Sequence, residues 1–228
     1  MSLEDKRECL AITKKDLTRV VRSIKESKKK LTGVQTWPIY DSNHSAYKNH
    51  FSEFQRSIED ISKIENPVVI DLLSSSSAIR SLFLDTLHED MKGVSVGLED
   101  LRPGNIRVID RKLHVTHIVG DLGKPSTWDC IKTELGERKA NLILERGYAG
   151  VAYLPQDPLY FLYAMDKIWN TLSSENGTFI GDFIQISIPK NSIYNWSENM
   201  QKKGIDIECG INSIKVVKHI NSPQKLPK

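Results

Sequence analysis

The chain has 228 residues, of which 27% are charged and 39% hydrophobic, and its formal net charge at pH 7 is +3. This length suffices for one large domain with an extension and excludes two full domains of ordinary size. The mild charge excludes the strongly basic composition that is typical of dedicated nucleic-acid-binding proteins.

Cysteine spacing and hydropathy indicate the compartment in which the protein is expected. Cys9, Cys130 and Cys209 are odd in number and far apart in the sequence, so neither a disulfide framework nor a zinc site is indicated. No basic and apolar leader opens the chain, and no apolar run is long enough to cross a bilayer. We therefore expect a cytoplasmic protein without a membrane partner and without a bound metal.

Residues 1–65 predict a helical extension. Apolar side chains recur at steps of seven in its first helix, at Leu3, Leu10, Leu17, Ile24 and Leu31. This spacing would suit a homodimer seam, but polar side chains at Lys6, Thr13 and Ser27 favour a helix laid across the main domain. Ten Lys or Arg against five Asp or Glu in residues 1–35 leave a nucleic-acid or acidic partner open.

A polar loop, Thr36–Tyr47, follows and carries Trp37 and Tyr40. Loops with several aromatics just before a cofactor-binding strand often close over the pocket as a lid. The same aromatics could instead pin the first helix to the core, and both interpretations stay open. A second helix is expected over His44–Ile64, because apolar residues recur there on one face.

The centre of the chain is a strand, a turn and a helix between Asn66 and Asp90. The run Val68–Leu73 is apolar on both faces except for Asp71, which predicts a buried parallel strand. Four serines then make a tight turn, and helical spacing predicts a helix over Ala78–Asp90. In an open α/β sheet this turn binds ligands, since the helix presents free amide groups and the positive end of its dipole. We expect a small charged cofactor there.

Two further strands end in acidic residues. The second strand, Gly93–Leu98, runs into Glu99 and Asp100, and a carboxylate one strand and helix beyond the turn can accept both hydroxyls of a ribose. We expect Glu99 to take this role.

The third strand, Leu113–Val119, leads to Asp121 and Leu122. Asp121 could take the amino group of an adenine while Leu122 covers its face. The alternative is an ordinary turn or cap acid, because a helix is expected at Trp128–Leu135.

The fourth strand, Ala140–Glu145, continues into a loop that faces whatever binds opposite the cofactor. Glu145, Arg146 and Tyr148 are therefore expected to contact a substrate, through binding rather than proton transfer. Glu145 and Arg146 could also simply pair with each other.

The rest of the chain alternates in the same way and then closes with two strands. We expect a helix over Pro158–Leu172, a strand over Thr178–Ile186 and a short helix over Ser192–Lys202. An antiparallel hairpin, Ile205–Glu208 with Ile214–Ile220, ends the domain at residues 66–220, and residues 221–228 predict a loose tail.

This order resembles the class I S-adenosylmethionine-dependent methyltransferase fold over about Asn66–Ile220, a Rossmann-like α/β sheet, mostly parallel, with a closing antiparallel hairpin. VVIDLLSSSS stands where the family has an acidic residue followed by a glycine-rich turn, and GLED stands where it has the acid that binds the ribose. VGDL stands where the family has the acid on the adenine side, and NLILERG stands where it has the fourth strand and the substrate loop. The resemblance implies S-adenosylmethionine as cofactor, with binding residues Asp71, Ser74, Ser75, Glu99, Asp121 and Leu122.

The chain departs from the family at the turn, where Leu73, Ser75 and Ser77 stand in place of glycines. Serines can offer hydroxyls and capping oxygens, whereas Leu73 adds bulk where the cofactor would run. The alternative to a methyltransferase is therefore a catalytically inactive binding or assembly protein of the same fold. The methyl acceptor, a small molecule or a macromolecule, and any catalytic base are not assigned by the sequence, although no Asn-Pro-Pro-Tyr-type loop follows the fourth strand.

Overall fold

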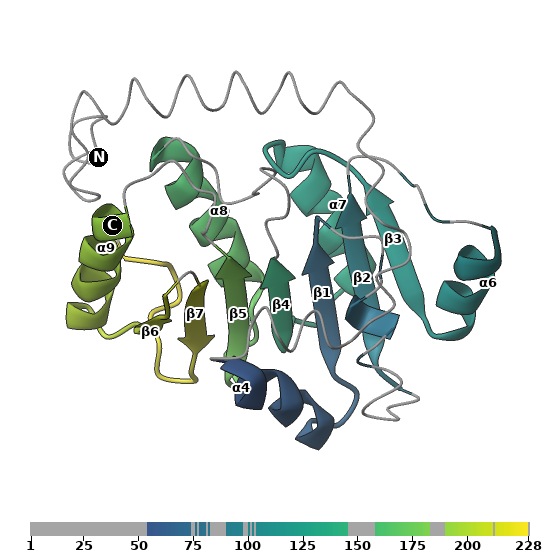
Figure 1. Cartoon of the computed structure of the whole chain (residues 1–228), viewed down its shortest axis with the longest axis horizontal. Coiled ribbons are helices and arrows are strands. Elements are labelled where there is room, and N and C mark those ends of the chain that lie inside the picture. The colour runs from purple at the N-terminus through teal and green to yellow at the C-terminus, as the bar shows by residue number, and fades with distance from the viewer. Residues whose placement is uncertain are drawn as a thin grey trace.

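The computed structural model describes residues 54–73, 76, 78–80, 82, 90–97, 100, 102, 104–145, 158–182, 190–211 and 213–227. In these residues one mixed sheet has the strand order β3-β2-β1-β4-β5-β7-β6 (Figure 1). The strands are β1 (Val68–Leu72), β2 (Lys92–Gly97), β3 (Val115–Val119), β4 (Leu142–Glu145), β5 (Gly177–Asp182), β6 (Asp206–Cys209) and β7 (Ser213–Lys218). β1 to β5 are parallel, and β7 is antiparallel to both β5 and β6. The predicted fold class is confirmed.

Helices cover both faces of the sheet. The described helices are α4 (Gln55–Glu59), the 3-10 helix η2 (Asp60–Lys63), α6 (Gly104–Lys112), α7 (Pro125–Leu135), α8 (Pro158–Thr171) and α9 (Lys190–Lys202). Buried side chains of α7, α8 and α9 share one core cluster, and those of α4 and η2 share another with Ala78, Ile79 and Leu82. α6 lies beyond β3, at the end of the sheet (Figure 1).

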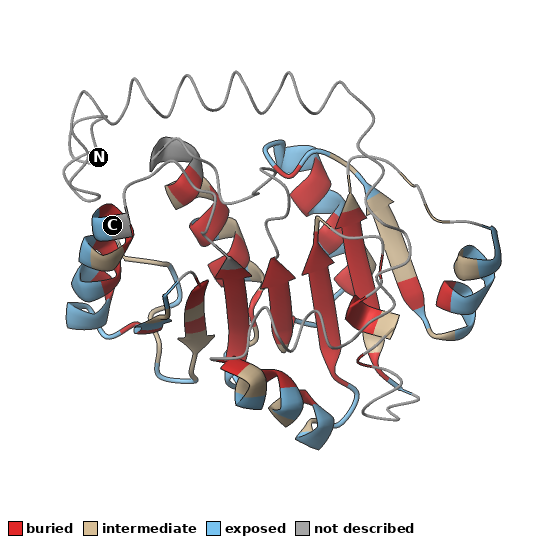
Figure 2. Ribbon diagram, viewed as in Figure 1, coloured by how far each residue is buried: buried red, intermediate tan, exposed pale blue. Residues whose placement is uncertain are grey.

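Strand β1 is buried on both sides, and its residues alternate between the two clusters. Val68, Ile70 and Leu72 pack into the α7–α9 cluster, whereas Val69 packs into the other one. A strand with two buried faces needs a nearly continuous apolar run, which is why the sequence of β1 does not alternate with polar residues. Figure 2 shows the burial continuing through β4 and β5 and declining at the edge strand β3.

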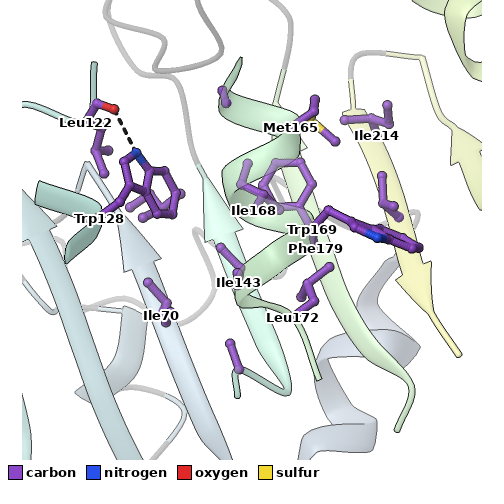
Figure 3. Close-up of a cluster of buried hydrophobic side chains, with 14 of the residues drawn as sticks. Ile70, Leu122, Trp128, Ile143, Met165, Ile168, Trp169, Leu172, Phe179 and Ile214 are labelled. Atoms are coloured by element: carbon purple, nitrogen blue, oxygen red, sulfur yellow. Dashed lines mark hydrogen bonds between the residues drawn. The ribbon is translucent and has the colours of Figure 1, made fainter. Parts of the chain in front are cut away.

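The α7–α9 cluster is rich in large side chains (Figure 3). Phe161 and Trp196 meet edge to face, with ring centroids 5.0 Å apart and an interplanar angle of 89°. Such aromatic pairs add roughly 0.5–1.5 kcal/mol beyond the burial of their area. Trp128 is also buried and donates from Nε1 to the carbonyl oxygen of Leu122 at 2.9 Å, so it ties the loop after β3 to the core.

The structure extends the sequence analysis at the amino-terminal side. Predictions for residues 1–53, including the heptad helix and the aromatic loop, lie outside the described residues. The end of the predicted extension belongs to the main core, because Phe54, Ile58 and Ile61 are buried against the sheet. The domain therefore starts before Asn66.

Two further features differ from what the sequence indicated. Helix α6 was not expected, and Asp110 is its one buried residue. The tail after β7 is docked rather than loose. Trp169 donates from Nε1 to the carbonyl oxygen of Pro223 at 3.0 Å, and Leu226 packs against the α7–α9 cluster.

Candidate functional site

The sheet places its chemically active groups at the carboxyl ends of the parallel strands. Chain order reverses between β1 and β4, which are neighbours in the sheet. In open α/β sheets ligands bind outside the strand ends at such a reversal. Asp71 near the end of β1 and Glu145 at the end of β4 stand on its two sides, and both are fully buried.

These two carboxylates lie on opposite faces of the sheet. Asp71 is in register with Leu144 and shares the face of Val69, on the α4 side. Glu145 shares the face of Ile143, on the α7–α9 side, where a Cβ at Gly181 would lie 3.3 Å from its Oε2. The predicted cofactor acid and the predicted substrate acid are therefore separated by the sheet itself.

The turn after β1 has a backbone that ordinarily favours glycine. Leu73 has φ 59° and Ser76 has φ 69°, both in the left-handed region. For an L-residue this conformation costs about 1–2 kcal/mol. The half-buried Leu73 side chain packs against the α7–α9 cluster, while Ser74 and Ser75 lie outside the described residues. The turn therefore keeps a glycine-type backbone although leucine and serine occupy it.

The loop after β2 is held by arginines. Glu99 lies outside the described residues, but its neighbour Asp100 accepts from Arg102 Nε at 2.8 Å and Nη2 at 3.0 Å. Hydrogen bonding from Arg102 lowers the pKa of Asp100 from 3.8 to about 2. Arg107 of α6 adds an ion pair to the same carboxylate at 3.3 Å. The segment next to the predicted ribose acid is thus fixed to α6.

A second carboxylate joins this network from α6. Asp110, 1% exposed, accepts from Ser76 Oγ at 2.7 Å, from Arg102 Nη1 at 2.7 Å and from Arg80 Nη1 at 3.1 Å. Asp110, Arg80 and Arg102 were not predicted as site residues. A lone acid in a polar segment resembles a solvated surface residue, so the sequence carried no signal that could have found it.

The β2–β3 pair adds a buried polar contact on the face of Asp71. Ser95 is fully buried, and its Oγ lies 2.7 Å from Nδ1 of His117 in the neighbouring strand. His114 precedes β3 as a turn residue with φ 53°. In the described part of the chain, no group of three or more His, Cys, Asp or Glu could hold a metal ion.

The loop after β3 is ordered by its own hydrogen bonds. Asp121 is exposed, and its Oδ1 accepts from the backbone N–H of Gly123 at 2.9 Å. Its carbonyl oxygen accepts from the Thr127 hydroxyl at 2.7 Å, as expected of a turn acid before a helix. Leu122 is buried in the core cluster. The adenine roles of Asp121 and Leu122 remain predictions, as do those of Arg146 and Tyr148, which lie outside the described residues.

A hollow of about 460 Å³ lies away from this region, where β6 turns into β7. It is lined by Phe54, Tyr194, Glu208, Cys209, Gly210 and Ile211. Tyr194 donates to the carbonyl oxygen of Gly210 at 3.1 Å, and Glu208 pairs with Lys215. In the sheet β4, β5 and β7 separate this hollow from β1, so it is distinct from the predicted cofactor turn.

Comparison with known proteins supports the fold through structure alone. No family model and no curated protein matches the sequence. Two crystal structures of the MycE methyltransferase from the mycinamycin biosynthetic pathway, in complex with Mg and SAH, are similar. One has a TM-score of 0.54 at 11% identity over 85% of this chain and 53% of that one, and the other 0.52 at 10% identity over 82% and 50%. An O-methyltransferase family protein from Burkholderia thailandensis has a TM-score of 0.46 at 10% identity, over 80% of this chain and 62% of that one.

The chain has the class I methyltransferase fold. It spans about half the length of the MycE methyltransferase. Its own sheet closes with the antiparallel strands that the sequence predicted. Among the helices that the structure describes, none is long and apolar enough to cross a membrane.

Proposed function

We propose that the chain is an S-adenosylmethionine-dependent methyltransferase that binds its cofactor at the carboxyl ends of β1 and β2. The observation that carries this proposal is the left-handed backbone at Leu73 and Ser76, directly after the buried Asp71. Strained backbone persists only where the surrounding structure enforces it, and it concentrates at ligand sites. Its position at the reversal of strand order is where the fold binds ligands.

The polar side chains around this turn suit an adenosyl cofactor. Carboxylates suit the hydroxyls and amino groups of a nucleoside and of a methionine moiety. We assign cofactor binding to Asp71, Ser74, Ser75, Glu99, Asp121 and Leu122. When bound, S-adenosylmethionine supplies a methyl sulfonium whose carbon an acceptor nucleophile can attack.

The protein's own contribution to this reaction is alignment. Holding two reactants in line replaces an encounter in solution and accounts for much of the rate in such transfers. We place the acceptor at the end of β4, with Glu145, Arg146 and Tyr148 binding it. The buried Glu145 belongs to the face opposite Asp71, so acceptor and cofactor would approach from different sides of the sheet end.

Thermal stabilisation by S-adenosylhomocysteine tests cofactor binding. At a hundred times its dissociation constant, a ligand of the folded state adds about 2.7 kcal/mol to the free energy of unfolding. We expect a clear rise in Tm and a measurable Kd by calorimetric titration. Asp71→Asn should weaken this affinity about tenfold, whereas Glu134→Gln on α7 should leave it unchanged. Absence of any Tm shift at millimolar ligand would refute the proposal.

The second candidate is a methyltransferase-like binding protein without catalysis. It is favoured by the leucine at the first turn position, where the family that the sequence resembles has a glycine. The two candidates separate when radiolabelled S-adenosylmethionine is incubated with the protein and separate RNA, protein and small-molecule fractions. Label transferred to one fraction supports the enzyme and names the acceptor class. Ligand binding without transfer to any fraction supports the second candidate.

A further inference from the structure

The buried carboxylate of Asp110 on α6 accepts hydrogen bonds from two separate segments of the chain. The Asp110 carboxylate accepts from Ser76 and Arg80, which follow β1, and from Arg102, which follows β2. α6 itself lies at the end of the sheet beside β3 (Figure 1). A single carboxylate therefore connects to one helix the two loops that border the proposed cofactor site.

The Asp110 carboxylate has more partners than are needed to balance its charge. One guanidinium would neutralise Asp110, yet it receives two guanidinium groups and a hydroxyl. Buried ion pairs add little net stability relative to apolar packing, and their best-supported use is to select one arrangement. The planar guanidinium fork fixes orientation as well as distance. The expected effect of this network is therefore on the placement of the two loops.

Ser76 shows how this placement is achieved at the turn. Its hydroxyl donates to Asp110 at 2.7 Å and accepts from Arg80 Nη1 at 2.5 Å. Its backbone is left-handed, with φ 69°, and its side chain is fully buried. The two hydrogen bonds hold a serine in a conformation that a glycine would adopt at lower cost. The serine side chain thus stabilises the turn that its Cβ disfavours.

Arg102 extends the network to the second loop. One of its nitrogens binds Asp110 while two others bind Asp100 at 2.8 and 3.0 Å. Arg107 adds hydrogen bonds to the carbonyl oxygens of Arg102 and Asp100, at 3.0 and 3.3 Å. Both ends of the Asp100–Arg102 segment are therefore fixed to α6.

We propose that Asp110 is a positioning residue that sets the separation between the turn after β1 and the loop after β2. Its importance for ligand binding rests on the proposed function, because these loops would hold the methionine and ribose parts of the cofactor. The Asp110 carboxylate is engaged by Ser76, Arg80 and Arg102, so we assign it no cofactor contact of its own. It acts through Ser76 and Arg102.

Hydrogen–deuterium exchange of the full-length protein without ligand tests the coupling. Asp110→Asn should raise amide exchange at least tenfold in peptides covering both residues 73–82 and residues 97–104. Arg102→Lys is the second variant, because an ammonium group cannot reproduce the fork between Asp100 and Asp110. The matched control is Glu134→Gln, which removes the 3.0 Å Lys92–Glu134 ion pair at the other end of β2. It should leave both peptides unchanged.

Affinity for S-adenosylhomocysteine gives the second readout. We expect Ser76→Ala and Arg102→Lys each to weaken binding about tenfold. Because both act through Asp110, the double variant should lose about tenfold in total, rather than the hundredfold of independent sites. In the Asp110→Asn background, neither change should weaken binding further.

The outcomes separate this inference from the proposed function. If the wild-type protein binds S-adenosylhomocysteine, and Asp110→Asn and Arg102→Lys bind it equally well with both peptides protected, the positioning role is wrong. If exchange rises in only one peptide, the coupling between loops is wrong. If the wild-type protein does not bind the ligand but both peptides respond, the coupling is upheld and the methyltransferase proposal is the one that fails.

Discussion

The two faces of the sheet differ in what they bury. The α7–α9 face is filled with large apolar side chains, with Phe161, Trp169 and Trp196 among the most deeply buried, and Glu145 is the fully buried charged side chain that the described strands place on it. The opposite face buries Asp71, Ser95 and, at the loops, Ser76. Apolar packing on the α7–α9 face thus stabilises the fold. The opposite face carries most of the polar groups near the proposed cofactor turn. Substitutions on the two faces should therefore separate loss of folding from loss of binding.

The largest effect is expected on the apolar face, from Phe161→Ala. Removing this fully buried ring, which meets Trp196 edge to face, should lower the free energy of unfolding by about 3–5 kcal/mol. Urea denaturation measures the change, and Phe161→Leu serves as the conservative control with a smaller loss. A loss below about 1 kcal/mol for the alanine variant would contradict the assignment of cohesion to this face.

A smaller loss of stability is expected from Gly181→Ala, next to the buried Glu145 on the same face. The new Cβ would lie 2.5 Å from the Phe179 ring and 3.3 Å from the Glu145 carboxylate. Overpacking of this kind costs about 1–3 kcal/mol. Gly104→Ala is the control, since nothing lies within 4 Å of its added methyl. Equal stability of the two variants by thermal unfolding would contradict the overpacking, because it would show that the Phe179 ring moves away at no cost.

Leu73 can be probed with a pair of substitutions. Leu73→Ala removes packing but keeps the left-handed strain, whereas Leu73→Gly removes both. The glycine variant should therefore be more stable than the alanine variant by about 1 kcal/mol. It should also bind S-adenosylhomocysteine several-fold more tightly than wild type, because bulk is removed from the turn. Weaker binding by the glycine variant would show that the leucine contributes to the site.

The smallest effect concerns acid stability on the polar face. Because the pKa of Asp100 is lowered from 3.8 to about 2, its charged form favours the folded state. This contribution is fully present above about pH 4 and is lost as pH falls through about 2. After allowance for solvent screening it amounts to about 1 kcal/mol or less. Asp100→Asn should flatten stability between pH 4 and 2, and an unchanged acid profile would argue against the ion pairs with Arg102.

The sequence predicted the sheet better than it predicted the polar face. The strands of the parallel region are short apolar runs buried on both sides, so β1 and β4 were recognisable without any long-range information. The placement of Asp71 and Glu145 on opposite faces follows from strand alternation, and we did not predict it. The burial of Asp110 on helix α6 was missed because two of its partners, Ser76 and Arg80, are distant in sequence. Such partners come together only when the sheet is formed.

The left-handed backbone of the turn was also beyond prediction. Leucine and serine rarely adopt it, so the sequence indicated a turn that had lost its glycines rather than one that kept their geometry. The side chains that hydrogen-bond the Ser76 hydroxyl lie 4 and 34 positions away, at Arg80 and Asp110. Local sequence therefore could not reveal why the serine is tolerated.

The docked tail has a consequence for handling the protein. Pro223 caps the indole of Trp169, and Lys218 lies over the same ring at 5.1 Å while donating to the Trp169 carbonyl oxygen. Cleavage after Ile220 would leave a buried indole donor without its acceptor and would bare part of the core beneath Leu226. A product of limited proteolysis near this end would therefore expose apolar core surface and self-associate. The presence of residues 221–227 is thus a simple quality criterion for any preparation.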